Sequence, residues 1–204
     1  MKKVNLTVAM FSVLLLAVSI VGCGNNKNTE TAISKTFGIF TVSDNGLTAK
    51  VEGTIVDTSL QDFHKMMVQY PNLQTLDLVD VPGSDVSGDL KSDMALDLGR
   101  EVYQKNINTH LVDNGFVASG GTDLLASGKS VTVGNNPEIG VHAWGGGFED
   151  NPNASAWDIK DDESHIEHQK YLRYYEDIGF SKQKAKDFYF FTIRSRLSSK
   201  LCKF

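Results

Sequence analysis

Short apolar runs alternate with helix-like patterns along the middle of the chain, and this alternation constrains the fold more than any other sequence feature. Two of the runs, Leu73–Val81 and Ile107–Val112, have the length and composition of buried parallel strands. The segment between them, 91–105, carries apolar residues four apart, which is the spacing of a helix. A strand–helix–strand order needs a crossover connection, which is right-handed in known folds. The sequence therefore predicts an α/β fold with a mostly parallel sheet and helical crossovers.

The elements before this centre are an expected hairpin and a helix. Strands are predicted at Gly38–Val42 and Thr48–Ile55, and the residues between them, Ser43–Gly46, have hairpin-turn chemistry. A helix with apolar residues at helical spacing follows, and either Thr58 or Ser59 caps its start.

The elements after the centre end in an ambiguous aromatic segment. Short strands are predicted at 130–134 and 138–144, and the Gly-, Asn- and Asp-rich segment 145–162 is a loop or lid. A helix is predicted at 164–178. The aromatic segment 187–193 fits the start of a helix or an extended segment that packs on the sheet.

The N-terminus has the order of an export signal. Lys2 and Lys3 form a positive region, and the apolar run Val8–Val21 after them is too short and wrongly flanked for a comfortable membrane span. The run ends in Ile-Val-Gly-Cys, which resembles a bacterial lipobox. This resemblance implies that Cys23 is lipidated, for instance with palmitate, and becomes the first residue of the mature chain. The other interpretation is an ordinary secretory signal with an incidental cysteine, and Gly22 before the cysteine favours the lipobox.

These features divide the chain into three segments. We expect a lipoprotein signal peptide at 1–22, a polar flexible tether at 23–35 and one α/β domain at 36–204. If Cys23 is lipidated, Cys202 has no partner for an intramolecular disulfide, and no zinc-type spacing of cysteines is present.

Charge and motifs exclude several partners. The formal net charge is −5, and no basic patch interleaved with aromatic residues occurs, so no nucleic-acid partner is expected. No motif indicates a cofactor. His165 and His168 are close in sequence, but no carboxylate or cysteine cluster makes them a metal site.

The stretch 114–128 carries the main candidate for chemistry. Ser119 lies where a strand-like run gives way to a helix-like run, and two glycines follow it. A serine at such a turn can be a nucleophile beside backbone amides that hold an oxyanion. The alternative is a serine that only caps the helix after it.

Two further loops are expected beside this serine, because sites in parallel sheets form at the carboxyl ends of strands. Gly83 follows one predicted strand in a Pro-Gly-Ser turn, and His142 lies in the segment Ile-Gly-Val-His-Ala-Trp. Neutral histidine is suited to take the proton of Ser119 near pH 7. The backbone amides of Gly83 and Gly120 are the candidate oxyanion donors.

The order of these motifs, Pro-Gly-Ser, Ala-Ser-Gly-Gly-Thr and Ile-Gly-Val-His-x-Trp, resembles the Clp-protease/crotonase superfamily over residues 46–193. The resemblance is to its Clp-protease-like branch, including uncharacterised periplasmic proteins and lipoproteins. It implies a ClpP/crotonase-like fold, with Ser119 as nucleophile, His142 as base and a homo-oligomer. The family pattern continues with another helix and strand, whereas this chain ends in the short basic tail 194–204. Clp-type proteases also need ring assembly and an unfoldase, and because no motif here indicates either, processive proteolysis is not inferred.

The order of the superfamily triad, Ser then His then Asp, implies an orienting acid after His142. Asp187 is the candidate because aromatic residues follow it, as they do in the Clp pattern. Asp158 and Asp177 compete with it, and any of the three is more often a solvated surface charge.

Three functions remain open. The first is a membrane-anchored serine hydrolase or peptidase of the bacterial cell envelope, facing the periplasm or the outside, which transfers an acyl group from a peptide or ester-like substrate. The second is a noncatalytic envelope lipoprotein that keeps the fold and binds a peptide or another ligand. The third is a crotonase-like acyl-CoA enzyme, which a Ser–His pair and an envelope location both disfavour.

Overall fold

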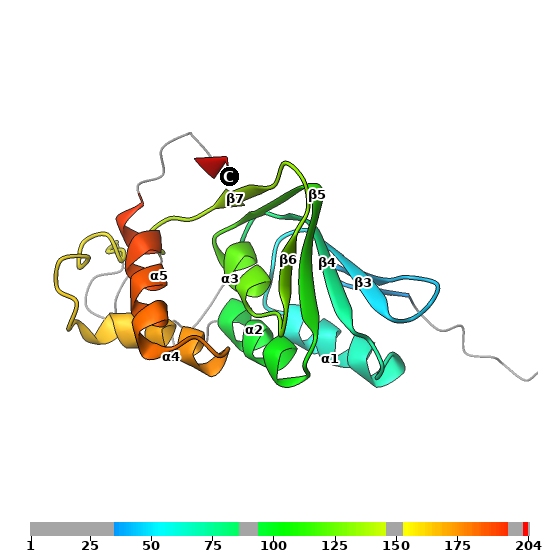
Figure 1. Ribbon diagram of the computed structural model, residues 1–204. Coiled ribbons are helices and arrows are strands. Elements are labelled where there is room, and N and C mark those ends of the chain that lie inside the picture. The colour runs from blue at the N-terminus through cyan, green and yellow to red at the C-terminus, as the bar shows by residue number, and fades with distance from the viewer. Residues whose placement is uncertain (1–34, 86–93, 146–152, 196–201, 204) are drawn as a thin grey trace, which may run out of the picture. The chain divides into compact units, whose positions relative to one another are not determined.

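The computed structural model describes residues 35–85, 94–145, 153–195 and 202–203 (Figure 1). All of these belong to one compact unit, Ile33–Phe204. The predicted signal peptide and the tether up to residue 34, with Cys23, lie outside the described residues. Within these ranges, none of the helices is long and apolar enough to cross a membrane.

The described residues form a mixed α/β fold with eight strands and five α-helices. The strands are β1 (Thr36–Phe37), β2 (Phe40–Val42), β3 (Thr48–Glu52), β4 (Thr75–Val81), β5 (Asn108–Ala118), β6 (Val131–Val133), β7 (Glu138–Gly140) and β8 (Cys202–Lys203). The helices are α1 (Ser59–Gln69), α2 (Met94–Gln104), α3 (Gly120–Ala126), α4 (Gln169–Asp177) and α5 (Lys182–Arg194), with the 3-10 turn η1 (Ile166–His168) before α4.

The centre of the sheet is parallel and its two edges are antiparallel. The strand order is β1-β2-β3-β4-β5-β7-β8, and β6 also pairs with β5. Strands β3, β4, β5, β6 and β7 pair in parallel, whereas β1, β2 and β3 pair antiparallel, as do β7 and β8. The expected α/β class is therefore confirmed, and a mostly parallel sheet is confirmed in part.

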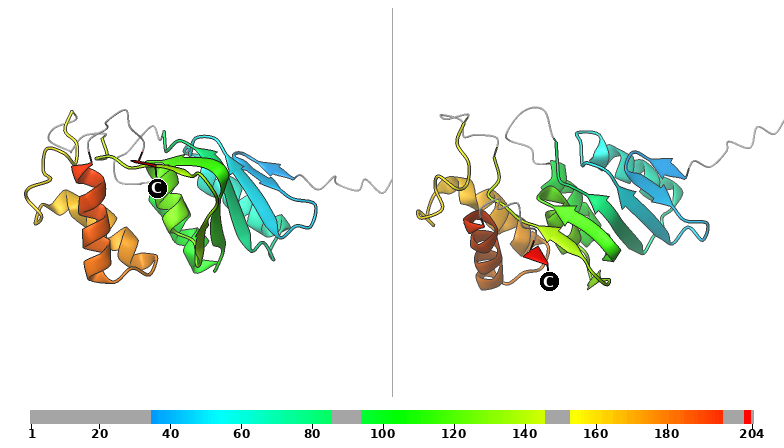
Figure 2. Two further views of the ribbon diagram at one scale, coloured as in Figure 1. Left: turned by 45° about the horizontal axis from the view of Figure 1, so that its top comes forward. Right: turned by 90° about the horizontal axis from the view of Figure 1, so that it is seen from above.

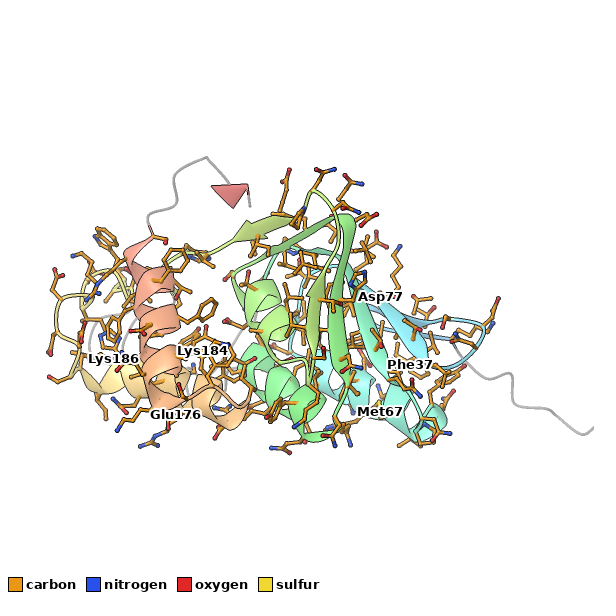
Figure 3. The ribbon with its side chains drawn as sticks, in the orientation of Figure 1. Phe37, Met67, Asp77, Glu176, Lys184 and Lys186 are labelled. Atoms are coloured by element: carbon orange, nitrogen blue, oxygen red, sulfur yellow. The ribbon has the colours of Figure 1, made fainter. Side chains whose placement is uncertain are left out.

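Helices α1, α2 and α3 lie along one face of the sheet (Figures 1 and 2). Alternate strand residues such as Leu76, Leu78 and Leu111 are buried in the core cluster on this face. Phe37 of β1 belongs to the same cluster, and Met67 of α1 packs against it (Figure 3). The strand residues that alternate with these buried apolar residues point to the opposite face of the sheet.

The other face carries a row of polar side chains. Lys50, Asp77 and His110 are paired across β3, β4 and β5, and the His110 ring is hydrogen-bonded to Thr132 of β6 at 2.8 Å. Asp77 projects from β4 (Figure 3), and partial burial raises the pKa of its carboxyl.

Most predicted elements are confirmed, and the exceptions concern their ends. The hairpin of β2 and β3, helix α1 with Thr58 at its cap position, and β4 occur as expected. The strand expected to end at Val112 instead continues as β5 to Ala118. Asn114 takes a positive φ of 57° within it, and the pairing with β4 shifts register between Leu78 and Asp80. This irregularity lets the first part of β5 pair with β6 and the last part with β7.

The C-terminal helices form a second, aromatic cluster. The helix expected at 164–178 is the turn η1 followed by α4, and the ambiguous segment 187–193 is part of helix α5. Tyr174, Tyr175 and Tyr189 are fully or almost fully buried between these elements. Glu176 lies on α4, and Lys184 and Lys186 lie on the exposed side of α5 (Figure 3).

Candidate active site

Ser119 is held in a strained conformation between β5 and α3. Its φ of 50° and ψ of −126° lie in a region that residues with a side chain rarely occupy. A serine that only caps a helix would accept a hydrogen bond from the first turn, but Ser119 makes no side-chain cap bond. Its hydroxyl instead borders two cavities. The capping interpretation therefore does not account for this serine.

Two hydrogen bonds to one carbonyl fix the serine turn against the end of β7. The Ser119 amide donates to the Gly140 carbonyl at 3.1 Å, and the Thr122 hydroxyl donates to the same oxygen at 2.8 Å. Parallel pairing of Val117 with Ile139 precedes these contacts. The segment that carries His142 therefore leaves the sheet directly beside Ser119.

The turn after β4 brings Gly83 to the other side of Ser119. Gly83 has a φ of +144°, and its carbonyl accepts a hydrogen bond from the Ile55 amide at 2.9 Å. Its own amide is in no backbone hydrogen bond among the described residues. The Gly120 amide is the first of α3, a position with no intrahelical acceptor. Neither of these two amides therefore donates a hydrogen bond within the sheet or within a helix, among the described residues.

Close packing at the start of α3 depends on a second glycine. A Cβ added to Gly121 would lie 2.0 Å from the Val81 carbonyl oxygen, at the end of β4. The start of α3 therefore contacts the backbone of β4 directly, which draws the Ser119 and Gly83 turns together.

The sequence predicted a strand over 138–144 that includes His142, but β7 ends at Gly140 and His142 lies beyond it. Its Nδ1 is 2.7 Å from the Ala143 carbonyl oxygen. Because a carbonyl oxygen only accepts, Nδ1 carries the proton and the Nε2 of the neutral ring has a lone pair. Among the described residues no hydrogen bond joins Ser119 to His142, although both line the same two cavities.

The three candidate acids are not brought to this histidine. Asp187 is exposed on α5, accepts a hydrogen bond from Gln183 at 2.8 Å and lines a separate groove. Asp177 accepts from Arg100 at 2.8 Å. Asp158 accepts from the Ser155 amide and hydroxyl, which lower the pKa of its carboxyl.

The larger cavity beside the serine has a volume of about 420 Å³. It is lined by Thr54, Pro82, Gly83, Ser84, Asp85, Ser119, His142, Trp144, Gly145 and Tyr171. The smaller one, about 30 Å³, lies between Ser119, His142 and the aromatic cluster and also borders Asp123. Asp123, Trp144 and Tyr171 were not among the predicted site residues.

Sequence spacing contained a signal for two of these additional residues. Asp123 is four residues after Ser119, on the first turn of α3, and therefore shares a face with the serine. Trp144 is two residues after His142, and in an extended segment such residues point to the same side. Tyr171 comes from the distant helix α4, and no local pattern connects it to the site.

Asp123 links the site to the aromatic cluster. The Tyr175 hydroxyl donates to its carboxylate at 2.6 Å, and the Tyr174 hydroxyl donates to its backbone carbonyl at 2.7 Å. Burial, followed by the nearby Asp123 charge, raises the pKa of Tyr175 well above its usual value, so this tyrosine remains a donor.

A second chain of hydrogen bonds holds Trp144. Its Nε1 donates to the Tyr189 hydroxyl at 3.0 Å, and this hydroxyl is 2.8 Å from Nδ1 of the buried His168. The His168 Nε2 lies 3.2 Å and 3.1 Å from the carbonyls of Ile159 and Asp162, so Nε2 carries the proton and Nδ1 accepts from Tyr189. Burial lowers the pKa of His168, which keeps the ring neutral.

The described residues contain no candidate metal site, and the comparisons with known proteins assign no family. Within the part of the chain that the structure describes, no group of three His, Cys, Asp or Glu side chains could hold a metal ion. No family model and no curated protein matches the chain. A solved structure described as a "putative enoyl-CoA hydratase from Streptomyces avermitilis" is similar at a TM-score of 0.37 and 10% identity, over 52% of this chain and 49% of that one. The matched region thus spans about half of each protein.

Proposed function

We propose that this protein is a serine hydrolase that transfers an acyl group to Ser119, with His142 as general base. The observation that carries the proposal is the strained Ser119, whose hydroxyl makes no cap bond and borders a cavity shared with His142. Strain of this kind costs about 1–3 kcal/mol and persists only where surrounding structure enforces it. A strained serine at a strand-to-helix turn is also the arrangement that exposes a nucleophile in hydrolases of other folds.

The proposed reaction uses Ser119, His142 and Gly83, which line the cavity, and Gly120, which directly follows the serine. The Ser119 oxygen attacks the carbonyl carbon of an ester or amide while His142 Nε2 takes the hydroxyl proton. The Gly83 and Gly120 amides stabilise the oxyanion of the tetrahedral intermediate. This intermediate expels the alcohol or amine, which takes the proton from His142. Water, deprotonated by the same ring, then releases the acid from the acyl-serine.

In this proposal the Ala143 carbonyl performs the task that a triad aspartate performs elsewhere. By accepting from Nδ1, it holds His142 in the tautomer whose Nε2 can take a proton. The proposal requires Ser119 and His142 to form their hydrogen bond when substrate binds, and catalytic hydrogen bonds are often long in the absence of substrate.

The alternative is a noncatalytic protein that binds a peptide or another ligand in the same cavity. The missing Ser119–His142 hydrogen bond is the observation that favours it. The place of Ser119 at a strand-to-helix turn favours the hydrolase, because this turn is the one that exposes a nucleophile in hydrolases of other folds.

The proposed location is the bacterial cell envelope, with the protein anchored through lipid on Cys23. The support is the sequence order of positive region, apolar run and Ile-Val-Gly-Cys. Cys23→Ser should release the protein from the membrane fraction or stall its processing. Equal membrane retention of both forms would show that the anchor is absent.

A fluorophosphonate probe tests the hydrolase proposal. The purified protein should be labelled, whereas Ser119→Ala and His142→Ala should each lose labelling while keeping the wild-type circular dichroism spectrum. A known serine hydrolase serves as the positive control. If it is labelled and the folded wild-type protein is not, the hydrolase proposal fails and the binding function replaces it.

A further inference from the structure

The cavity beside Ser119 combines aromatic rings with a carboxylate and has no cationic side chain among its described lining residues. Trp144 and Tyr171 form its aromatic part, and Asp85 is its carboxylate. The smaller cavity adds the Asp123 carboxylate and, likewise, no described lysine or arginine. The described lining of both cavities therefore carries carboxylates without a lysine or an arginine, and the full chain has a formal net charge of −5.

The aromatic part is a stack that is fixed at both ends. Trp144 stacks on Tyr171 with centroids 5.8 Å apart and planes 10° apart, and Tyr171 stacks on Tyr189 at 5.5 Å and 19°. The hydrogen bond from Trp144 Nε1 to the Tyr189 hydroxyl ties the ends of the stack together. A rigid indole is the side chain that attracts cations most strongly through its ring face.

The backbone of the acidic part is held by an isolated parallel bridge between Ile55 and Ser84, which also holds Gly83. The Asp85 amide donates to the Ile55 carbonyl at 2.8 Å, and the Ile55 amide donates to the Gly83 carbonyl at 2.9 Å. These two bonds form a parallel bridge that sets the backbone of Asp85 two residues from the candidate oxyanion donor. The backbone of Asp85 thus lies at a fixed position relative to the Gly83 turn, within reach of the cavity that both residues line.

We propose that this cavity selects substrates with a basic side chain near the scissile carbonyl, and that guanidinium fits best. A planar guanidinium stacks on an aromatic ring and binds a carboxylate through two parallel hydrogen bonds, so Trp144 and Asp85 offer complementary contacts. Anionic substrates, including acyl-CoA with its phosphates, would face these carboxylates without a described cation to offset them. Turnover of such substrates rests on the proposed hydrolase function, whereas their binding does not.

Binding to the Ser119→Ala protein separates the two claims. The probes are the methyl esters of Nα-acetylarginine and Nα-acetylcitrulline, which match in shape and differ in charge, and isothermal titration calorimetry measures their affinities. The arginine ester should bind about tenfold more tightly, as expected for a partly exposed ion pair plus a cation–π contact. Adding Asp85→Asn should remove most of this preference. Asp44→Asn is the matched control, because Asp44 lies in the β2–β3 turn with its side chain 96% exposed.

Equal affinity of the two esters, or a preference that survives Asp85→Asn, would overturn the substrate proposal whether or not the protein is a hydrolase. In the wild type, the ratio of kcat/KM for the two esters should match the ratio of affinities. Preferential binding without turnover or fluorophosphonate labelling would support the selective cavity and reject the hydrolase. Fluorophosphonate labelling without a preference for the arginine ester would support the hydrolase and reject the selective cavity.

Discussion

Gly83 lies directly against the Ser119 side chain. A Cβ added to Gly83 would stand 3.2 Å from the Ser119 Cβ and 3.7 Å from its hydroxyl oxygen. The two residues are distant in sequence, and the parallel pairing of Val81 with Val117 brings their turns together. The same turn provides the candidate oxyanion amide, so the proximity of Gly83 to the serine is essential to the proposed chemistry.

Gly83→Ala should slow fluorophosphonate labelling at least about tenfold, because a methyl group at this φ displaces the amide that holds the oxyanion. Labelling rates and circular dichroism measure the effect. Gly46→Ala is the control, since it also places an alanine at a positive φ, +70°, in the distant β2–β3 turn. Equal loss of labelling in both variants would indicate a general loss of folding rather than a local effect.

Ser119→Gly should abolish labelling and raise the free energy of unfolding by about 1 kcal/mol, because glycine adopts φ 50° and ψ −126° without strain. Ser119→Ala keeps the Cβ and should not stabilise the protein. Urea unfolding of the three proteins measures the difference. A glycine variant no more stable than the alanine variant would mean that the serine conformation is not strained.

Asp187→Asn should leave the labelling rate within about twofold of wild type, since Asp187 lies on the exposed side of α5 and binds Gln183. Stopped-flow or gel-based labelling at several probe concentrations gives the rate constant. A large decrease would restore Asp187 as the orienting acid and remove that role from the Ala143 carbonyl.

Stability should decrease as the pH falls below about 6.5, the ordinary pKa of histidine, because His168 has a lowered pKa in the folded protein. Burial is the main cause, so the unfolded chain takes up a proton more readily than the folded one, and acid favours unfolding. His168→Gln cannot titrate and should show a smaller loss of Tm between pH 7.5 and 5. Thermal melts of both proteins in matched buffers measure this, and an unchanged pH dependence in the variant would exclude His168 as its source.

The serine turn could be predicted from sequence because its signals are local. A strand-like run, then Ser119, then two glycines and a helix-like run describe the observed junction of β5 and α3. The end of the strand was misplaced because Asn114, a turn-forming residue, occurs inside β5 at a positive φ. Long-range pairing with β4 and β7 extends the strand past it, and a local pattern does not contain that information.

The groups around His142 were not predictable from local patterns. The choice of Asp187 relied on an order of residues in a resembling family, whereas the direction of a helical side chain depends on how α5 packs. Burial of Tyr189, Phe190 and Ile193 turns Asp187 outward. A backbone carbonyl such as that of Ala143 has no sequence signature, and Tyr171 reaches the cavity only through packing of α4.

Localisation of the fluorophosphonate adduct tests the central claim most directly, because two serines, Ser84 and Ser119, line the same cavity. The labelled protein is digested and the modified residue is identified by tandem mass spectrometry. We predict a single adduct on Ser119, absent when the protein is unfolded before labelling and unchanged by Ser84→Ala. An adduct on Ser84, or equal modification of several surface serines, would contradict the assignment of Ser119 as the nucleophile.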